Sequence, residues 1–252
     1  MSKIFDHLQL ASYDVLDEVE RSGKRIECPI CKRMYKYYCY NCRKPLLNTP
    51  TLNLPITLDV ILHPTEKVSK STALAATILA PQDTNWIVYP DVPEYDENTT
   101  LLLFPSPDAK PINEIENLQQ YKRIVCIESV WKKAKQVASC VNVKNLKKVV
   151  IQSHETVFWR YQQLGKTNLA TIEAIYYFYR EWYDALKLPY CGQVDNLLYF
   201  YCHQYRKIQK HYNDHPEISF VHIDNYIQYD EKKEMKDNQN NQNEQEMKEK
   251  KE

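Results

Sequence analysis

Glycine is scarce in this chain. Three glycines, Gly23, Gly165 and Gly192, are present among 252 residues. A dinucleotide-binding G-x-G-x-x-G turn and a phosphate-binding P-loop each need several glycines within a few residues. The scarcity excludes both motifs, so a nucleotide-like ligand would have to be held by another arrangement.

Net charge and long apolar runs are also lacking. The chain carries 33 Lys and Arg residues against 33 Asp and Glu residues. Its overall charge is therefore zero and does not indicate a class of binding partner. No run approaches the length of a membrane span, and residues 1–25 lack the apolar core of a secretory signal. We therefore expect no membrane association. We also expect a reducing compartment, in which the eight cysteines are free, catalytic or metal-bound rather than paired in disulfides.

Four of these cysteines form two C-x-x-C pairs, Cys28 with Cys31 and Cys39 with Cys42. Four thiolates satisfy a tetrahedral Zn²⁺ and leave no open position, so the spacing predicts a structural zinc. The seven-residue linker favours a tight hairpin at residues 34–38. Unligated core cysteines are the alternative, and a redox role would need a thioredoxin-like context that is missing.

Short apolar runs alternate with helical patterns along the middle of the chain. Strands are expected at residues 56–62, 86–89, 101–104, 124–128 and 147–152. Helices are expected at residues 8–19, 71–79, 113–121, 129–138, 171–186 and 196–212. This alternation predicts an α/β domain with a mainly parallel sheet and flanking helices.

Composition divides the chain into four parts. A leading helix at residues 1–24 precedes a small four-cysteine zinc module at 25–48, and the main α/β domain is expected at 49–229. Beyond that, Lys, Glu, Asn and Gln dominate without aromatic residues. Such a segment buries too little apolar surface to fold, so residues 230–252 are expected to be disordered.

A carboxylate stands where the apolar strand 124–128 passes into a helical pattern. Ligands bind beyond the carboxyl ends of strands in open α/β sheets, so Glu128, Ser129 and Trp131 are candidate site residues. The alternative is a plain helix start, in which Ser129 is an N-cap and Trp131 a core aromatic.

Basic residues gather around this strand. Residues 121–150 hold eight Lys and Arg residues against Glu128 alone, a local net charge of +7. Such a face attracts a polyanion such as RNA, and a solvated lysine face is the alternative. The basic end of the expected helix 196–212 either faces RNA or complements the helix dipole.

Seven segments together resemble the DTW-domain family, specifically the eukaryotic tRNA-uridine aminocarboxypropyltransferases. They occur in family order from Cys28 to about Tyr205: the CPIC and CYNC pairs, ILHPTEKVSKSTALAATILAP, LLLFPSPDA, VCIESVW, VFWRYQQLGK, TIEAIYYF and GQVDNLL. The resemblance implies a SPOUT-like, knotted fold that binds S-adenosylmethionine through backbone loops, without a glycine-rich turn.

The implied activity is transfer of the 3-amino-3-carboxypropyl group of S-adenosylmethionine to N3 of a D-loop uridine in tRNA, leaving methylthioadenosine. S-adenosylmethionine would be the co-substrate, zinc a structural metal and tRNA the partner. No obligate protein partner is evident. The resemblance also implies nuclear residence, with the cytoplasm as a second compartment.

Site residues follow from the same resemblance. The family pattern D-x-T-W appears here as Glu128-Ser129-Val130-Trp131, so the carboxylate is one methylene longer and the threonine hydroxyl is gone. Glu128 would remove the N3 proton, with Ser129 and Trp131 beside it. Ser129 restores the hydroxyl only if the strand end rotates, because adjacent strand residues face opposite sides.

The remaining implied residues form two groups. The cofactor pocket would be lined by Pro105, Ser106, Asp108, Ala109, Ser153, Thr171, Glu173 and Ala174. RNA phosphates would be bound by Lys132, Lys133, Lys135, Arg160 and Lys166. For Glu173 the alternative is a purely electrostatic role at its helix N-terminus.

Two other functions stay open. A methyltransferase on the same scaffold would need only the other orientation of S-adenosylmethionine. A zinc-stabilised RNA-binding protein that has lost catalysis would bind tRNA with a steep salt dependence and release no methylthioadenosine.

Overall fold

The computed structural model describes residues 5–160, 167–215, 217–220, 223 and 226–229. The expected disordered tail at 230–252 and the candidate RNA-binding residue Lys166 lie outside these residues. No helix in the described part of the chain is long and apolar enough to cross a membrane.

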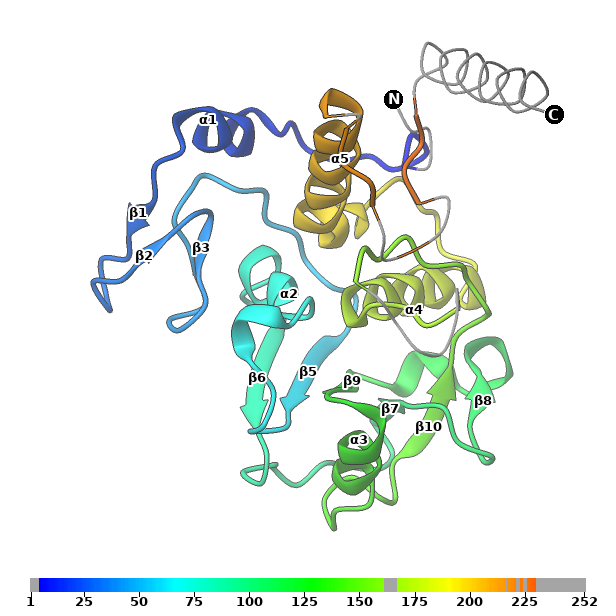
Figure 1. Cartoon of the computed structure of the whole chain (residues 1–252). Helices are drawn as coiled ribbons and strands as arrows, with labels where there is room; N and C mark the ends of the chain where they lie inside the picture. Colours follow the sequence, from blue (N-terminus) through cyan, green and yellow to red (C-terminus); the bar gives the residue numbers. More distant parts are fainter. Residues whose placement is uncertain (1–4, 161–166, 216, 221–222, 224–225, 230–252) are drawn as a thin grey trace, which may run out of the picture.

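A six-stranded sheet forms the centre of the molecule (Figure 1). Its strands are β5 (Thr57–Leu62), β6 (Thr84–Val88), β7 (Thr100–Leu103), β8 (Lys110–Pro111), β9 (Arg123–Glu128) and β10 (Lys147–Val150). Their order is β6-β5-β9-β7-β10-β8, and every neighbouring pair is parallel. The predicted α/β class with a mainly parallel sheet is confirmed.

Helices cover both faces of this sheet. α2 (Leu74–Leu79) and α4 (Thr171–Ala185) lie on one face and α3 (Trp131–Ala138) on the other, while α1 (Asp14–Ser22) and α5 (Tyr199–Asp214) lie further out (Figure 1). Side chains of β9 alternate between the two cores, with Ile124 and Cys126 in the α2 and α4 core and Val125 in the α3 core. Burial on both faces explains why the central strands β5, β7 and β9 read as continuous apolar runs.

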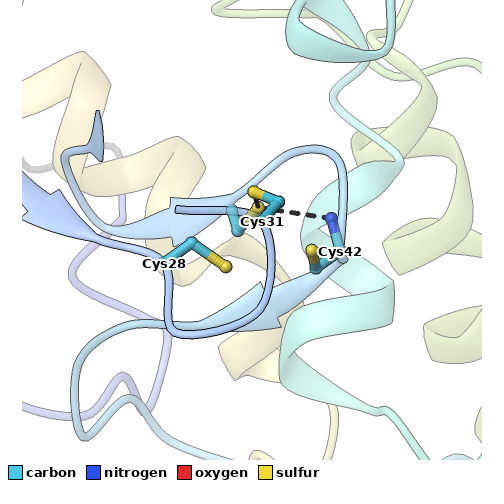
Figure 2. Close-up of side chains that lie close together, drawn as sticks. Cys28, Cys31 and Cys42 are labelled. Atoms are coloured by element: carbon cyan, nitrogen blue, oxygen red, sulfur yellow. Dashed lines mark hydrogen bonds between the residues drawn. The ribbon is translucent and has the colours of Figure 1, made fainter. Parts of the chain in front are cut away.

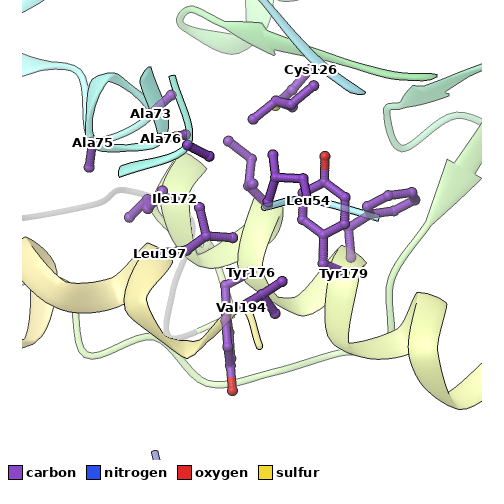
Figure 3. Close-up of a cluster of buried hydrophobic side chains, with 14 of the residues drawn as sticks. Leu54, Ala73, Ala75, Ala76, Cys126, Ile172, Tyr176, Tyr179, Val194 and Leu197 are labelled. Carbon is purple, nitrogen blue, oxygen red and sulfur yellow. The ribbon is translucent and has the colours of Figure 1, made fainter. Parts of the chain in front are cut away.

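Small side chains let α2 approach its neighbours closely. Ala73, Ala75 and Ala76 are at most 5% exposed and belong to the same core as Ile172 of α4 and Leu197 (Figure 3). Because an interior is close-packed, alanine at these positions leaves no room for larger residues. The packing fixes the start of α4 beside the carboxyl edge of the sheet.

Two predicted helices differ from the structure. Residues 113–121 form two 3-10 turns, η2 (Ile112–Glu114) and η3 (Leu118–Gln120), because Asn117 between them is left-handed with φ 51°. The leading helix begins at Asp14 rather than residue 8. The N–H groups of Gln9 and Ala11 bind side chains of Asp195 and Asn196, which hold this segment against residues 195–196.

The other elements match within one to three residues. The helix expected at 196–212 divides into the 3-10 turn η4 (Asp195–Leu198) and α5. α1 ends at Gly23, whose left-handed φ of 64° lets its N–H bond the carbonyls of Val19 and Glu20.

Candidate active site and metal centre

The two C-x-x-C pairs lie at the turns of two antiparallel hairpins. One joins β1 (Ile26–Glu27) to β2 (Met34–Tyr35), and the other joins β3 (Tyr38–Cys39) to β4 (Lys44–Pro45). The predicted hairpin at residues 34–38 is wrong, because β2 and β3 belong to separate sheets. The chain reverses within each C-x-x-C turn instead. The residue after the second cysteine has a positive φ, which is 60° at Lys32 and 52° at Arg43.

The four sulfur atoms of Cys28, Cys31, Cys39 and Cys42 all lie within 4.8 Å of one another. Figure 2 shows those of Cys28, Cys31 and Cys42 turned towards a common centre. The Sγ atoms of Cys31 and Cys39 are 3.5 Å apart. Tetrahedral zinc with bonds of ~2.3 Å separates its sulfur ligands by ~3.8 Å, so the cluster is compatible with a structural zinc.

The electrostatics of the cluster agree with a metal centre. The N–H of Arg33 lowers the pKa of Cys31 to about 7, and the N–H of Cys31 lowers the pKa of Cys28. Burial and the neighbouring sulfurs raise the pKa of Cys42 to about 12. Four adjacent thiolates repel one another unless a cation screens them, and a divalent metal supplies that screening.

The four-cysteine module, residues 25–48, is fixed against the outer helices. Tyr38 packs edge-on against Phe200 of α5, with ring centroids 4.8 Å apart. The Glu20 carboxylate of α1 forms two ion pairs. One is with the ammonium group of Lys36 in the module at 2.5 Å, and the other is with that of Lys207 in α5 at 2.9 Å. The module is therefore tied to both α1 and α5.

The candidate active site lies at the carboxyl edge of the sheet. Glu128 is the last residue of β9, and its backbone carbonyl accepts the N–H of His63, which follows β5, at 3.2 Å. Phe104, directly after β7, contacts Trp131 with ring centroids 6.3 Å apart. Loops that follow three neighbouring parallel strands therefore meet at this edge.

Glu128 is held in a poorly solvated position. Burial raises its pKa above the ordinary 4.5, Glu66 adds to the rise, and the nearby Thr171 and Ser71 hydroxyls and the N–H of Ala73 oppose it. Within the described chain, Oε2 of Glu128 and Oγ of Ser71 are buried and have no hydrogen-bond partner. A buried polar atom left unpaired costs about 1–3 kcal/mol, so these two atoms mark a place for a polar ligand group.

The residues after Glu128 are positioned by Glu66. Its Oε1 accepts both the Ser129 hydroxyl and the Val130 N–H, each at 3.2 Å. Val130 is the N-cap of α3, so the alternative in which Ser129 caps the helix is wrong. Trp131 is 47% exposed, which excludes the core-aromatic alternative and leaves the indole facing solvent.

The predicted cofactor loop after β7 is ordered by Asp108. Its carboxylate accepts the Ser106 hydroxyl and the Lys148 ammonium, both at 2.7 Å. These two bonds lower the pKa of Asp108 to about 2. Pro105 is exposed and Ala109 half-buried, so the loop is accessible at the edge where Glu128 lies.

Glu173 has a structural role in this geometry. Its buried carboxylate accepts the N–H of Ala170 at 2.7 Å and the hydroxyl of Thr156 at 2.6 Å. It thereby caps the start of α4 and holds the segment that follows β10. Burial raises the pKa of Glu173. These contacts favour the interpretation in which Glu173 stabilises the N-terminus of α4 over the one in which it lines the cofactor pocket.

The other predicted pocket residues differ in their surroundings. Thr171 is the first residue of α4, and its hydroxyl lowers the pKa of Glu128. The structure therefore brings these two candidates together. Ala174 is half-buried one turn further along α4. Ser153 is exposed, three residues beyond β10.

The predicted RNA-binding cations fall into two groups. Lys132 and Lys135 are exposed and Lys133 half-buried on α3, whose first turn follows Glu128. Arg160 lies elsewhere and donates to the backbone carbonyl of Lys70 at 2.6 Å.

Two polar residues of the site, Glu66 and Ser71, escaped the sequence-based prediction. Both follow β5, whose last residue Leu62 lies opposite Glu128 in the parallel register. A signal existed, because polar residues after a buried strand belong at the carboxyl edge. Their meeting with the 128–131 segment depends on β5 being the neighbour of β9.

Fold and site together define a class: an α/β protein with a buried carboxylate at the carboxyl edge of a parallel sheet, joined to a four-cysteine module compatible with structural zinc. The DTW domain model matches residues 26–209. The chain belongs to the DTW-domain family, as the resemblance predicted.

Three curated relatives share the name tRNA-uridine aminocarboxypropyltransferase 1. The protein of Mus musculus is 35% identical, covering 81% of this chain and 83% of the relative. The Homo sapiens protein is 34% identical over the same shares, and that of Xenopus tropicalis 30% identical over 82% and 87%. No solved structure matches the chain.

Proposed function

We propose that this protein transfers the 3-amino-3-carboxypropyl group of S-adenosylmethionine to N3 of a D-loop uridine in tRNA, leaving methylthioadenosine. The names of its relatives support the reaction class. The observation that carries the proposal is the buried, unpartnered Oε2 of Glu128 at the carboxyl edge of the sheet.

The reaction needs a base. S-adenosylmethionine, when bound, supplies an electrophilic carbon next to a positively charged sulfur. Glu128 in its carboxylate form takes the proton from uridine N3 while N3 bonds to that carbon, and the electron pair of the broken carbon–sulfur bond stays on sulfur. Burial raises the pKa of Glu128, which makes its carboxylate a stronger base than an exposed one.

Other residues bind and orient. The unpartnered Ser71 hydroxyl fits a polar group of the co-substrate, and Thr171 stands beside it at the start of α4. The exposed loop after β7, which Asp108 orders through Ser106 and Lys148, offers further polar groups at this edge. The solvent-facing indole of Trp131 offers a stacking surface for a base.

The test is mass spectrometry of nucleosides from unmodified tRNA incubated with the protein and S-adenosylmethionine. We expect uridine heavier by an aminocarboxypropyl group, together with methylthioadenosine. Glu128→Gln should lower turnover by roughly 100-fold or more while keeping tRNA affinity. Uridine heavier by a methyl group would contradict the proposal and establish the methyltransferase alternative.

A second variant separates an active enzyme from a protein that has lost catalysis. The double substitution Glu128→Asp with Val130→Thr restores the family pattern. Wild-type protein that binds tRNA but releases no methylthioadenosine, with large gains in the double variant, would show that the native motif is impaired.

Three further predictions belong to this proposal. The knotted SPOUT-like topology is supported by the parallel sheet and its flanking helices. The division into 1–24, 25–48, 49–229 and 230–252 stays a prediction that limited proteolysis checks. Nuclear residence, with the cytoplasm as a second compartment, is checked by imaging the tagged full-length chain.

A further inference from the structure

A groove lies between α5 and the segment that follows β10, and Glu128 is not among the residues that line it. Its volume of about 610 Å³ is in the range of ligand pockets. The lining combines three aromatic rings with three basic side chains: Trp159, Tyr212, Phe220, Arg160, Lys207 and His211. Among the described residues that line it there is no carboxylate.

The rings of the groove are held in place by their neighbours. Trp159 lies against Tyr201 with centroids 5.3 Å apart. Phe220 stacks on Tyr226 at 4.8 Å, and Tyr212 meets the edge of Phe220 at 5.2 Å. Trp159, Tyr212 and Phe220 are half-buried, so each is anchored while part of it stays accessible. Such rings can receive a stacked base with little loss of side-chain entropy.

The charge of the groove is only partly compensated. Arg160 donates to a backbone carbonyl, which leaves its positive charge intact. Lys207 shares the single carboxylate of Glu20 with Lys36, so this trio keeps a net positive charge. A polyanion therefore complements the groove.

A hydrogen bond and a shared ion pair connect the groove to both parts of the proposed site. Arg160 donates to the backbone carbonyl of Lys70. The next residue, Ser71, has the hydroxyl that lowers the pKa of Glu128. Through Glu20, Lys207 connects the groove to Lys36 of the four-cysteine module. A strand of RNA in the groove would thus lie near the segment that carries Ser71.

Resting on the proposed tRNA substrate, we infer that this groove binds unpaired tRNA nucleotides adjacent to the target uridine. Bases stack on Trp159 and Tyr212, while Arg160 and Lys207 bind phosphates. Aromatic platforms in a basic groove suit single-stranded RNA, because paired bases do not expose their faces.

Affinity measurements without S-adenosylmethionine test this independently of transfer. The full chain is titrated with unmodified tRNA, a short oligouridylate and a duplex RNA of equal length. We expect Tyr212→Ala and Lys207→Ala each to weaken oligouridylate binding by roughly 10-fold and duplex binding far less. Lys210→Ala is the matched control, since Lys210 is exposed on the same helix, outside the groove, and pairs with Asp214.

Crosslinking to the wild-type protein tests the same inference without a variant, so it remains valid if a variant unfolds. tRNA carrying 4-thiouridine in its loops should crosslink to Trp159, Tyr212 or Phe220. Crosslinks confined to α3, or equal affinities for wild type and both groove variants, would overturn the inference. Competition by polyglutamate as strong as by oligouridylate, at equal charge, would point to an acidic protein instead.

Failure of the groove and failure of the transferase are distinguishable. If modified uridine forms but groove variants bind tRNA as wild type does, only the groove inference fails. If groove variants lose affinity while wild type forms no modified uridine, only the transfer reaction fails.

Discussion

At the scale of single residues, the position of Glu128 carries both a cost and a function. Its carboxylate is buried beside the Ser71 hydroxyl, and Oε2 has no partner in the described chain. Burial without a pair destabilises the charged form, which is why the pKa rises. In the proposed reaction, the deprotonated form that burial destabilises is the form that would accept the uridine proton.

This cost predicts how stability depends on pH. The native state binds the Glu128 proton more tightly than the unfolded state, whose pKa is near the ordinary 4.5. The free energy of unfolding therefore falls as pH rises from that value through the raised pKa. Glu128→Gln removes the titration, so we expect it to be more stable than wild type at about pH 8. The difference should vanish near about pH 4.

Urea denaturation across pH measures this difference. Glu114→Gln, at an exposed carboxylate, should leave stability unchanged at every pH. A constant offset between Glu128→Gln and wild type would mean that Glu128 titrates alike in both states. The acid limb of turnover should follow the same raised pKa, because the base works only when deprotonated.

Val130 supports a second prediction. It is the N-cap of α3 and provides no side-chain cap. Val130→Thr adds a hydroxyl that can accept an N–H of the first turn, so we expect a gain of about 0.5–1 kcal/mol in thermal or urea denaturation. Val130→Ala should give no gain. Increased turnover without increased stability would instead place the threonine of the family pattern in the chemistry.

Glu128 and its neighbours show what residue patterns reveal. Glu128 could be predicted because a carboxylate ended an apolar run, and that placement needs only the chain order. Its contacts with Ser71 and Thr171, and the bond from Ser129 to Glu66 across 63 residues, depend on which strands are neighbours. Nothing local in the sequence encodes that choice.

At the scale of elements, the four-cysteine module shows how two hairpins are joined into one unit. Each hairpin has only two residues per strand, too few to be stable alone. The buried Cys28 and Cys39 sulfurs replace a hydrophobic core, and Tyr38 fixes the unit on α5. Zinc binding is therefore expected to supply most of its folding free energy.

Removing one ligand tests this expectation. Cys39→Ser should lose bound zinc, measured by metal analysis, and lower the melting temperature by roughly 10 °C, because metal-dependent folding of the module is lost. Cys191→Ser, at an exposed thiol outside the cluster, should behave as wild type. A chelator-treated protein with unchanged melting and unchanged RNA affinity would refute a stabilising or docking role for the module.

Buried strands were the predictable elements, because parallel strands covered on both faces read as apolar runs. The helix expected at 113–121 failed at Asn117, whose left-handed backbone ends one turn and begins another. The expected hairpin at 34–38 failed because Lys32 and Arg43 adopt positive φ without glycine. Both errors arise from backbone conformations that residue type favours only weakly.

At the scale of the whole molecule, the net charge is zero, yet basic side chains are concentrated in two regions of the surface. Lysines of α3 follow Glu128 on one side of the sheet, and the basic groove on α5 lies beyond α2 and α4 on the other (Figure 1). If both basic regions bind RNA as proposed, they would hold a folded RNA at two points. Affinity for tRNA should then fall steeply with salt despite the neutral total.

The α3 lysines give this expectation a measurable slope. Replacing Lys132, Lys133 and Lys135 together with alanine should weaken tRNA binding and reduce the slope of log affinity against log salt by about 2–3, since each phosphate contact contributes about 0.7–0.9. Replacing the same three with arginine keeps the charge and should keep the slope. If alanine leaves the slope unchanged, these lysines form a solvated face, and the salt dependence must come from the α5 groove and the four-cysteine module. An alanine variant with a lower slope but unchanged turnover at saturating tRNA would show that α3 contributes to capture of the RNA rather than to the step at Glu128.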